Sequence, residues 1–340
     1  MPLLVAIVGA GSWGTTAASL ACRNGPTLLW ARRHEVAAEI DGRHTNRSYL
    51  AGFTLPDQLR ATSSLEEAVG PADVVVMAVP SHGFRAVIGA LARSVRPSVP
   101  VVSLAKGLEV GTRLRMTEVV AELLPGHPVG VLTGPNLAKE IMSGYPAAAV
   151  LGMSDHEVAL DLQPVFASSS FRVYTNPDVV GCELAGALKN VMAIAAGMAD
   201  GMGFGDNTKA AMLTRGLAEM SRLGVALGGD PRTFAGLAGM GDLVATCSST
   251  QSRNHFVGEQ LGRGHTLAEI VGRMNMVAEG VKSSAVVVEL AADHGVEMPI
   301  AEQVQAVCHE GRPAAEAVAA LMSRRQRSEV PRPTVSGPGH

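Results

Sequence analysis

The segment Gly9-Ala10-Gly11-Ser12-Trp13-Gly14 constrains the fold of this chain more than any other feature. It follows the apolar run Leu4–Val8 and precedes a stretch of small residues, so it joins an expected strand to an expected helix. In that context Gly9 permits a tight turn, Gly11 lets the backbone approach a pyrophosphate, and Gly14 lets helix and strand pack closely. The helix N-terminus then offers free N–H groups to phosphate. The segment therefore predicts a dinucleotide-binding unit, the alternative being a glycine-rich turn without a ligand.

Further apolar runs alternate with helical patterns through the first half of the chain. Besides Leu4–Val8, the expected strands are Thr27–Trp30, Val74–Val79, Val101–Leu104, Val129–Leu132, Ala147–Leu151 and Phe171–Tyr174. Helix-length segments such as Thr15–Asn24 and Phe84–Val95 separate several of them, which indicates a sheet covered on both faces. The expected fold class is α/β, with a Rossmann-type, doubly wound, mostly parallel sheet.

Helical patterns dominate the second half of the chain. The expected helices are 179–199, 208–227, 254–263, 279–294, 299–310 and 313–324. We place a boundary at the Asn176-Pro177 turn, between a dinucleotide-binding domain (1–178) and an all-helical substrate domain (179–324). Residues 325–340 are rich in Pro, Gly, Ser and Arg, so we expect a disordered tail.

Composition argues against several classes of function. The 340 residues carry a net charge of only -3, which gives no basic field to hold nucleic acid. No run reaches the ~20 apolar residues of a membrane span, and the N-terminus lacks the basic start of a secretory signal. The four cysteines are scattered without a CxxC pair. We therefore expect a cytoplasmic protein with buried thiols and no metal site.

The end of the second expected strand bears on cofactor choice. A fold that prefers NAD usually has an acidic residue there, which accepts from the ribose 2′-hydroxyl. This chain has Arg32 and Arg33 instead, and arginine favours a 2′-phosphate. The sequence thus favours NADP(H), with NAD(H) still usable. Arg32 is the better ligand candidate, because Arg33 also fits a solvated residue at the start of the next helix.

Two other expected strands end in polar residues. His82 follows the strand Val74–Val79, and Lys106 follows Val101–Leu104. The carboxyl ends of parallel strands are where open α/β sheets bind ligands, so both side chains are candidates for the same crevice. The alternatives are a turn histidine and an ordinary exposed lysine.

Lys189 stands on an apolar helix. Its neighbours three and four residues away are Ala185, Gly186, Met192 and Ala193, all small or apolar. A lysine on such a face is either buried or extends its ammonium to a polar edge. Burial disfavours the charged form of a lysine, which makes it a usable acid or base near neutral pH. We predict a catalytic lysine, the alternative being a structural one.

Polar residues recur later in the helical half. Asp242 lies in the run Gly236–Leu243, which we expect to be a glycine-rich loop, and Ser252, Arg253 and Asn254 stand at the start of an expected helix. Hydroxyl, guanidinium and amide groups at a helix start suit a phosphate or a polyol. A capped helix with an exposed arginine is the plainer interpretation.

Taken together, these motifs resemble the bacterial-type soluble NAD(P)-dependent glycerol-3-phosphate dehydrogenases. The resemblance runs from about residue 4 to 324 and rests on several unlinked motifs. They are GAGSWGT (9–15), NRSYL (46–50), AVPSH (78–82), AKG (105–107), GPNLAKE (134–140), GALKNVMAIAAG (186–197), TRGLAEMSRLG (214–224), GLAGMGDL (236–243), SRN (252–254) and VAEG (277–280).

The resemblance implies a role for each matching residue. The expected cofactor contacts are Ser12, Trp13, Arg32, Lys106, Ala138, Arg253, Val277 and Glu279, beside the glycines of the loop. The expected glycerol 3-phosphate contacts are Lys106, Gly134, Asn136, Lys189, Asp242, Ser252, Arg253 and Asn254. Lys189 would be the proton acceptor, Asp242 would orient Lys189 or the substrate hydroxyl, and Lys106 would polarise the reacting oxygen. The resemblance also implies a supply of glycerol 3-phosphate for phospholipid synthesis, and it is compatible with a homodimer.

This chain departs from the family pattern at two places. Asn136 stands where the family usually has Ser or Thr, although an amide can also donate and accept hydrogen bonds, and Ala278 replaces a commoner Val. Two rival functions remain open. One is a β-hydroxyacid or 6-phosphogluconate-type dehydrogenase, against which SRN and GLAGMGDL argue; the other is a non-catalytic NADP-binding sensor, which would need no lysine on an apolar helix.

Overall fold

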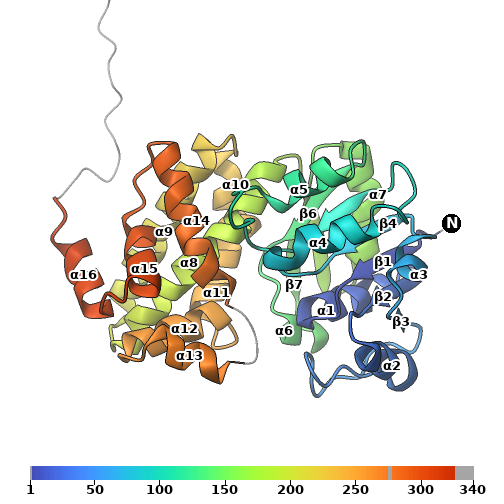
Figure 1. Ribbon diagram of the computed structural model, residues 1–340, viewed down its shortest axis with the longest axis horizontal. Helices are drawn as coiled ribbons and strands as arrows, with labels where there is room; N and C mark the ends of the chain where they lie inside the picture. Colours follow the sequence, from blue (N-terminus) through green and yellow to red (C-terminus); the bar gives the residue numbers. More distant parts are fainter. Residues whose placement is uncertain (1, 275–277, 326–340) are drawn as a thin grey trace, which may run out of the picture.

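The protein has two lobes, one built around a β-sheet and one built of helices (Figure 1). The computed structural model describes residues 2–274 and 278–325. Within these residues, strands and helices alternate up to Asn176, and only helices follow from Val179 onward.

A single eight-stranded sheet forms the first lobe. Its strands are β1 (Val5–Val8), β2 (Thr27–Trp30), β3 (Arg60–Thr62), β4 (Val74–Met77), β5 (Val101–Ser103), β6 (Val129–Thr133), β7 (Ala147–Met153) and β8 (Phe171–Asn176). Their order is β3-β2-β1-β4-β5-β6-β7-β8, parallel except that β7 pairs antiparallel to β6. The chain thus winds outward in both directions from β1, and the reversal lies between β1 and β4.

Alternate residues of the strands face two separate apolar layers. Val5 and Ile7 of β1 pack into the layer below α1 (Ser12–Ala21), α2 (His34–Arg43), α6 (Ala138–Met142) and α7 (His156–Phe166). Ala6 and Val8 face the layer below α3 (Leu65–Val69), α4 (Ser81–Leu91) and α5 (Met116–Leu123). Helices therefore cover both faces, as expected of a doubly wound sheet.

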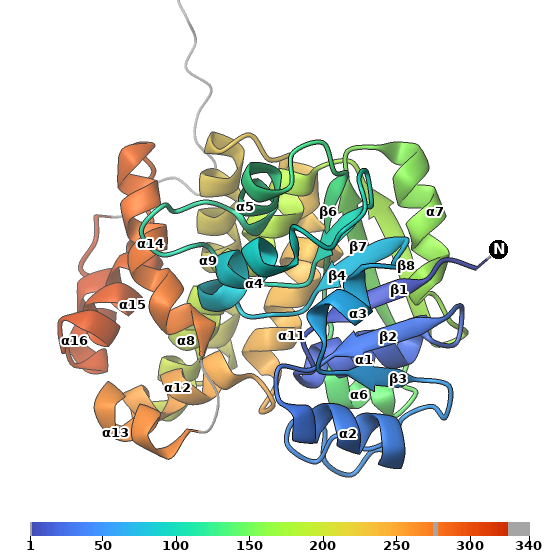
Figure 2. The ribbon, with the colours of Figure 1, turned by 45° about the vertical axis from the view of Figure 1, so that its right-hand side comes forward.

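The second lobe surrounds one long helix, α8 (Val179–Gly201). The other helices are α9 (Asp206–Ala226), α10 (Pro231–Ala235), the π-helical turn η1 (Leu237–Gly241), α11 (Asp242–Ser248), α12 (Arg253–Gly262), α13 (Leu267–Arg273), α14 (Glu279–Asp293), α15 (Pro299–His309) and α16 (Ala314–Met322). α8 contacts α9, α11, α12, α14 and α15, and also β6 and β7 of the sheet. It therefore forms the core of the helical lobe and also reaches the sheet (Figures 1 and 2).

Burial explains the composition of α8. It is the one helix of the described residues that is long and apolar enough to cross a membrane, but 83% of that apolar window is buried inside the protein. Every residue from Gly181 to Ile194 is buried. A helix that is apolar all round and enclosed by other helices is a core helix.

Glycines set the distance between α8 and α12. A Cβ at Gly258 of α12 would lie 2.0 Å from the carbonyl oxygen of Ile194, and one at Gly197 of α8 would lie 2.0 Å from that of His255. Gly201 and Gly262 repeat the arrangement one turn further along, at 2.2 and 2.3 Å. The two backbones touch along this seam, which holds the start of α12 beside the middle of α8.

The predicted fold class is confirmed, and most predicted elements are present. All seven expected strands and all six expected helices of the second half lie within two residues of their observed bounds. β3 was not expected, since Arg60–Thr62 is short and polar. α1 and α4 begin three residues earlier than expected, because each starts directly after the turn that follows its strand. The predicted tail falls almost wholly on residues 326–340, which lie outside the described residues.

One local prediction is wrong. The run Gly236–Leu243 is not a loop: after Gly236 it forms the π-turn η1 and the first residues of α11. Glycine usually disfavours helix. Here Gly239 is required by packing, because a Cβ at that position would lie 2.1 Å from the carbonyl oxygen of Phe234.

We expect Gly258→Ala to lower the free energy of unfolding by about 1–3 kcal/mol, since a methyl group at the seam must push α12 off α8. Gly89→Ala in α4 is the matched control, because a Cβ there meets no atom within 4 Å. That change should be neutral or stabilise by about 0.5–1 kcal/mol. Urea unfolding of both variants tests this; equal effects would refute the close packing of α8 and α12.

Candidate active site

The predicted site residues gather at the carboxyl edge of the sheet. Val8 of β1 pairs with Trp30 of β2 and with Met77 of β4, so these strands end level with one another. The glycine-rich loop follows β1, Arg32 follows β2, Lys106 follows β5 and Gly134 follows β6. Because β1 and β4 flank the reversal of strand order, this edge is where we expect the ligand crevice of an open α/β sheet, and we call it the crevice.

The three glycines of the loop have three different surroundings. Gly9 has a φ of +123°, and a Cβ there would lie 2.6 Å from the carbonyl oxygen of Ala78. A Cβ at Gly14 would lie 2.0 Å from the carbonyl oxygen of Gly9. A Cβ at Gly11 meets no atom within 4 Å. Gly9 therefore serves the turn and Gly14 the packing, whereas Gly11 leaves the outer side of the loop open.

The other residues expected near the cofactor have mixed surroundings. Ser12 donates from Oγ to the carbonyl oxygen of Tyr49 at 2.5 Å, and the centre of the Trp13 ring lies 6.4 Å from the centre of the Phe171 ring.

Arg32, the candidate for a 2′-phosphate, is exposed. Arg33 places its guanidinium 5.6 Å from the centre of the Tyr49 ring and pairs with Glu35, so it has partners of its own. Ala138 begins α6, and Val277 lies outside the described residues.

Two lysines share one buried carboxylate in this crevice. Lys106 Nζ donates to Asp242 Oδ2 at 2.6 Å, and Lys189 Nζ donates to Asp242 Oδ1 at 2.8 Å. The side chains of Asp242 and Lys189 are 3% and 8% exposed, and that of Lys106 is 17% exposed. Burial, only partly opposed by the Asp242 carboxylate, lowers the pKa of Lys106 to about 8. The three groups together carry one net positive charge beside the crevice, which suits an anion.

Separate elements bring these side chains together. Lys189 lies in the buried middle of α8, and Lys106 lies in the loop after β5. Asp242 is the first residue of α11, directly after the π-turn η1. A π-turn offsets the helix register by one residue, and such turns recur at functional sites.

A chain of hydrogen bonds between side-chain amides fixes the loop that carries Lys106. Asn190 Nδ2 donates to the Lys106 carbonyl oxygen at 2.8 Å, and Asn254 Nδ2 donates to Asn190 Oδ1 at 2.9 Å. The backbone N–H of Gly280 then donates to Asn254 Oδ1 at 2.9 Å. Both ends of the Asn254 amide thus have a partner within the protein, and its Nδ2 carries a second hydrogen besides the one donated to Asn190. The sequence offered one signal for Asn190, an amide next to Lys189 on an apolar helix.

The remaining substrate candidates lie around this centre. Gly134, with a φ of +118°, accepts a 2.8 Å hydrogen bond from Lys106 Nζ at its carbonyl oxygen. Asn136 buries both polar atoms of its amide without a partner among the described residues. Ser252 caps α12 by accepting from the N–H of His255 at 3.3 Å, and its Oγ lies 3.0 Å from that of Thr246. Arg253 is the first residue of α12.

Glu279 joins the two lobes at the side of the crevice. Its Oε1 accepts from the backbone N–H of Ser81, the first residue of α4, at 3.1 Å. Burial raises the pKa of the Glu279 carboxyl, against the opposing effects of that hydrogen bond and of the Arg253 charge. His82, beside Ser81, is exposed, and its pKa is lowered by partial desolvation and by the charges of Lys282 and Arg32. The charges of Arg32 and of Lys282 in α14 thus act on the first turn of α4.

A further contact between the lobes, at Glu183, is not predicted by the sequence. The buried carboxylate of Glu183, in the first turns of α8, accepts from the N–H of Thr117 at 3.0 Å and from its Oγ1 at 2.6 Å. Arg115 reaches the same carboxylate at 3.3 Å, and Arg113 pairs with Asp293 of α14. The loop between β5 and α5, which carries Lys106, is thereby held against the helical lobe (Figure 2).

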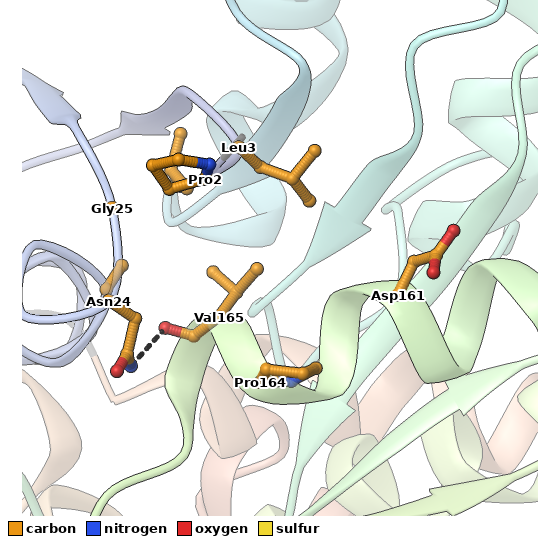
Figure 3. A pocket seen from close by; sticks show the side chains of 9 residues that line it. Pro2, Leu3, Asn24, Gly25, Asp161, Pro164 and Val165 are labelled. Atoms are coloured by element: carbon orange, nitrogen blue, oxygen red, sulfur yellow. Dashed lines mark hydrogen bonds between the residues drawn. The ribbon is translucent and has the colours of Figure 1, made fainter.

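The pocket drawn in Figure 3 lies at the other edge of the sheet. Residues that precede β1 and β2 line it, together with Asp161, Pro164 and Val165 of α7. None of the predicted site residues takes part. The amino ends of parallel strands are not where open sheets bind ligands, so we assign this pocket no catalytic role.

Comparison with known proteins identifies the same family for both halves of the chain. Residues 4–159 match the N-terminal region of NAD-dependent glycerol-3-phosphate dehydrogenases, and residues 178–319 match the C-terminal region. An NAD(P)+-type glycerol-3-phosphate dehydrogenase of Sphingopyxis alaskensis is 57% identical over 322 residues, covering 95% of this chain and 97% of its own. One of Mycobacterium avium is 54% identical over 336 residues, covering 98% and 97%.

Solved structures agree with these relatives. The crystal structure of glycerol-3-phosphate dehydrogenase from Coxiella burnetii superposes with a TM-score of 0.90 at 37% identity, covering 95% of this chain and 99% of that one. A ketopantoate reductase from Ralstonia eutropha, at 18% identity and a TM-score of 0.59, shares the fold alone.

Lys106 gives stability a pH dependence that can be measured. Between pH 8 and 10.5 the unfolded chain keeps a proton on this lysine that the folded protein releases, so this group makes the free energy of unfolding rise with pH. Lys106→Met removes the titration. We expect the difference in unfolding free energy, wild type minus variant, to increase from pH 8 to 10 and to stay constant from pH 6 to 7.5. A difference that is flat across both ranges would show that burial does not perturb Lys106.

Proposed function

The chain belongs to the NAD-dependent glycerol-3-phosphate dehydrogenase family, and from that premise we propose that it interconverts sn-glycerol 3-phosphate and dihydroxyacetone phosphate. The observation that carries the proposal is the pair Lys106 and Lys189 on the single carboxylate of Asp242, at the carboxyl edge of a dinucleotide-binding sheet. Interconversion of an alcohol and a ketone needs a proton donor and acceptor beside a hydride carrier. A buried lysine is suited to the proton transfer.

A nicotinamide dinucleotide fits the glycine-rich loop. The open outer side of Gly11 and the N-terminus of α1 suit a pyrophosphate, with Ser12 and Trp13 in the first turn of that helix. When bound, the cofactor supplies or accepts the hydride. Arg32 would hold a 2′-phosphate, so NADP(H) is preferred while NAD(H) remains usable. Ala138, Arg253, Val277 and Glu279 are the further residues we assign to the cofactor.

Lys189 acts as the proton donor and acceptor in this proposal. In reduction its ammonium gives a proton to the oxygen on C2 of the substrate, and in oxidation its neutral amine takes that proton back. Asp242 holds Lys189 in place and pairs with its ammonium group, which is buried. Lys106 supplies a second positive charge to the same oxygen, which stabilises the negative charge that develops there.

Substrate phosphate binds at the start of α12 in this proposal. Arg253 offers a guanidinium, and the first N–H groups of a ten-residue helix favour an anion. Asn136 and the backbone at Gly134 face the glycerol part, where the buried and unpartnered amide of Asn136 can both donate and accept.

Several wider proposals follow from family membership. Residues 1–178 form the dinucleotide-binding domain and residues 179–324 the substrate domain, with α8 beginning the second. The four cysteines are free and buried, which supports a reducing cytoplasmic location. Glycerol 3-phosphate made here would supply phospholipid synthesis. A homodimer stays a hypothesis, which the mass of the protein in solution would test.

Oxidation of NADPH with a panel of ketones tests the reaction. We expect turnover with dihydroxyacetone phosphate, far slower turnover with unphosphorylated dihydroxyacetone, and none with 2-ketoacids such as ketopantoate. The phosphate accounts for the difference, because the site holds cationic groups for it. Tight NADPH binding without turnover of any member would indicate a sensor, and preference for a ketoacid would indicate a hydroxyacid dehydrogenase.

We expect Lys189→Met to fold and bind NADPH but to lose at least about a hundredfold in kcat, because methionine fills the volume of the lysine stem without a titrating group. Lys209→Met is the matched control: this lysine pairs with Asp200 at 2.9 Å, outside the crevice, and should keep its activity. Lys189→Arg, which stays charged at all relevant pH, should lose activity like the methionine variant. Retention of most activity by either Lys189 variant would reduce Lys189 to a structural residue.

A further inference from the structure

The segment of residues 44–50, which follows α2, ties itself to the glycine-rich loop. Asn46 reaches the loop with its side chain, and Ser12 donates back to the carbonyl oxygen of Tyr49. On its other side the segment is fixed to α2, because Glu39 Oε1 accepts from Thr45 Oγ1 and from the N–H of Arg47, both at 2.9 Å. The loop is therefore held from outside by a segment with its own anchor.

Asn46 makes the central contacts of this arrangement. It is fully buried, and its Nδ2 donates to the carbonyl oxygen of Ala10 at 3.0 Å and to Thr15 Oγ1 at 2.8 Å. A carbonyl oxygen can only accept, so the nitrogen end of the amide must face Ala10. The other end, Oδ1, is buried without a hydrogen-bond partner among the described residues. Burying an unpartnered oxygen opposes folding, so stability alone does not explain an asparagine here.

The contact with Ala10 controls a peptide group of the loop. In a planar trans peptide the C=O of one residue and the N–H of the next point in opposite directions. Holding the Ala10 oxygen against Asn46 therefore turns the N–H of Gly11 away from Asn46. Gly11 is the N-cap of α1, and its own outer side is open. Thr15, the other acceptor of the amide, lies one turn into the same helix, so one side chain fixes both the turn and the helix start.

We propose that Asn46 is a positioning residue for the nicotinamide dinucleotide, because it fixes the orientation of the Ala10–Gly11 peptide and of the first turn of α1 that receive the pyrophosphate. The inference rests on the proposed function, since it assumes that a dinucleotide binds at this loop. The role given to Asn46 goes beyond that function, because this side chain touches neither the substrate nor the reacting atoms.

The pyrophosphate is common to NADPH and NADH, so the loss of Asn46 should weaken both cofactors alike. A role confined to binding also leaves the chemical step unchanged once cofactor saturates the enzyme. Arg32→Ala differs on the first point, since a lost 2′-phosphate contact weakens NADPH and spares NADH. The two variants thus separate loop geometry from phosphate recognition.

Asn24 provides the matched control, because its side-chain amide also donates to backbone carbonyl oxygens, but near the other end of α1. Its Nδ2 donates to the carbonyl oxygen of Val165 at 3.0 Å (Figure 3) and to that of Ala167 at 2.9 Å, both at the end of α7. Asn24→Ala therefore removes the same kind of side-chain amide near the other end of α1 without touching the glycine-rich loop. It should lower the thermal midpoint and leave cofactor affinity unchanged.

The experiment measures Kd for NADPH and for NADH, with kcat and the KM for dihydroxyacetone phosphate, in wild type, Asn46→Ala, Asn24→Ala and Arg32→Ala. We expect Asn46→Ala to raise both Kd values by about tenfold, the scale of a lost hydrogen bond with its geometry, while kcat at saturating NADPH stays within about twofold. Asn46→Ser, too short to reach Ala10, replaces it if the alanine variant does not fold.

Cofactor affinity within about twofold of wild type would overturn the proposal, as would a fall in kcat without a change in Kd. Unfolding of both Asn46 variants would also overturn it, because Asn46 would then be a structural residue. Failure of the proposed function is a separate outcome, since the wild-type protein itself would then bind neither dinucleotide.

Discussion

Two buried ammonium groups on one carboxylate set the requirements for the rest of the structure. Lys106 and Lys189 lie 2.6 and 2.8 Å from the two oxygens of Asp242, and all three side chains are largely out of water. Such a group is stable only if each charge keeps its partner, because an unpaired buried charge is costly. The unbalanced positive charge favours an anionic oxygen nearby. The same pairing of two lysines with Asp242 therefore opposes folding, because the charges are buried, and suits catalysis.

Holding these groups together requires parts of the chain that are far apart in sequence to meet. α8 lies at the centre of the helical lobe, contacts β6 and β7 of the sheet, and carries Lys189 in a stretch that is buried from Gly181 to Ile194. The glycine seam holds α12 against it, and the amides of Asn190 and Asn254 extend that contact to the backbone of Lys106. Near the other end of α8, Glu183 caps α5. The catalytic geometry therefore depends on backbone-to-backbone packing and on side-chain amides as much as on the charged groups.

Much of this could be predicted from the sequence. The strand–GxGxxG–helix order fixes its own conformation locally, since Gly9 and Gly14 are demanded by contacts within a few residues or with the adjacent strand. Lys189 could be singled out because its helical neighbours are apolar. Its partner Asp242 could be suspected but not placed, because the run around it is rich in glycine and predicts a loop. Packing against Phe234 instead makes this run a π-turn and the start of a helix. Asn46, Glu183 and the amide chain depend on long-range contacts, for which local periodicity gives no signal.

The most direct test of the account is a crystal structure of the protein with NADPH and glycerol 3-phosphate. The account predicts Lys189 Nζ at about 3 Å from the oxygen on C2 of the substrate, with Asp242 still paired to both lysines and the phosphate at the start of α12. It would be contradicted by a complex in which that oxygen lies beyond hydrogen-bonding reach of Lys189 and is contacted by another titratable side chain.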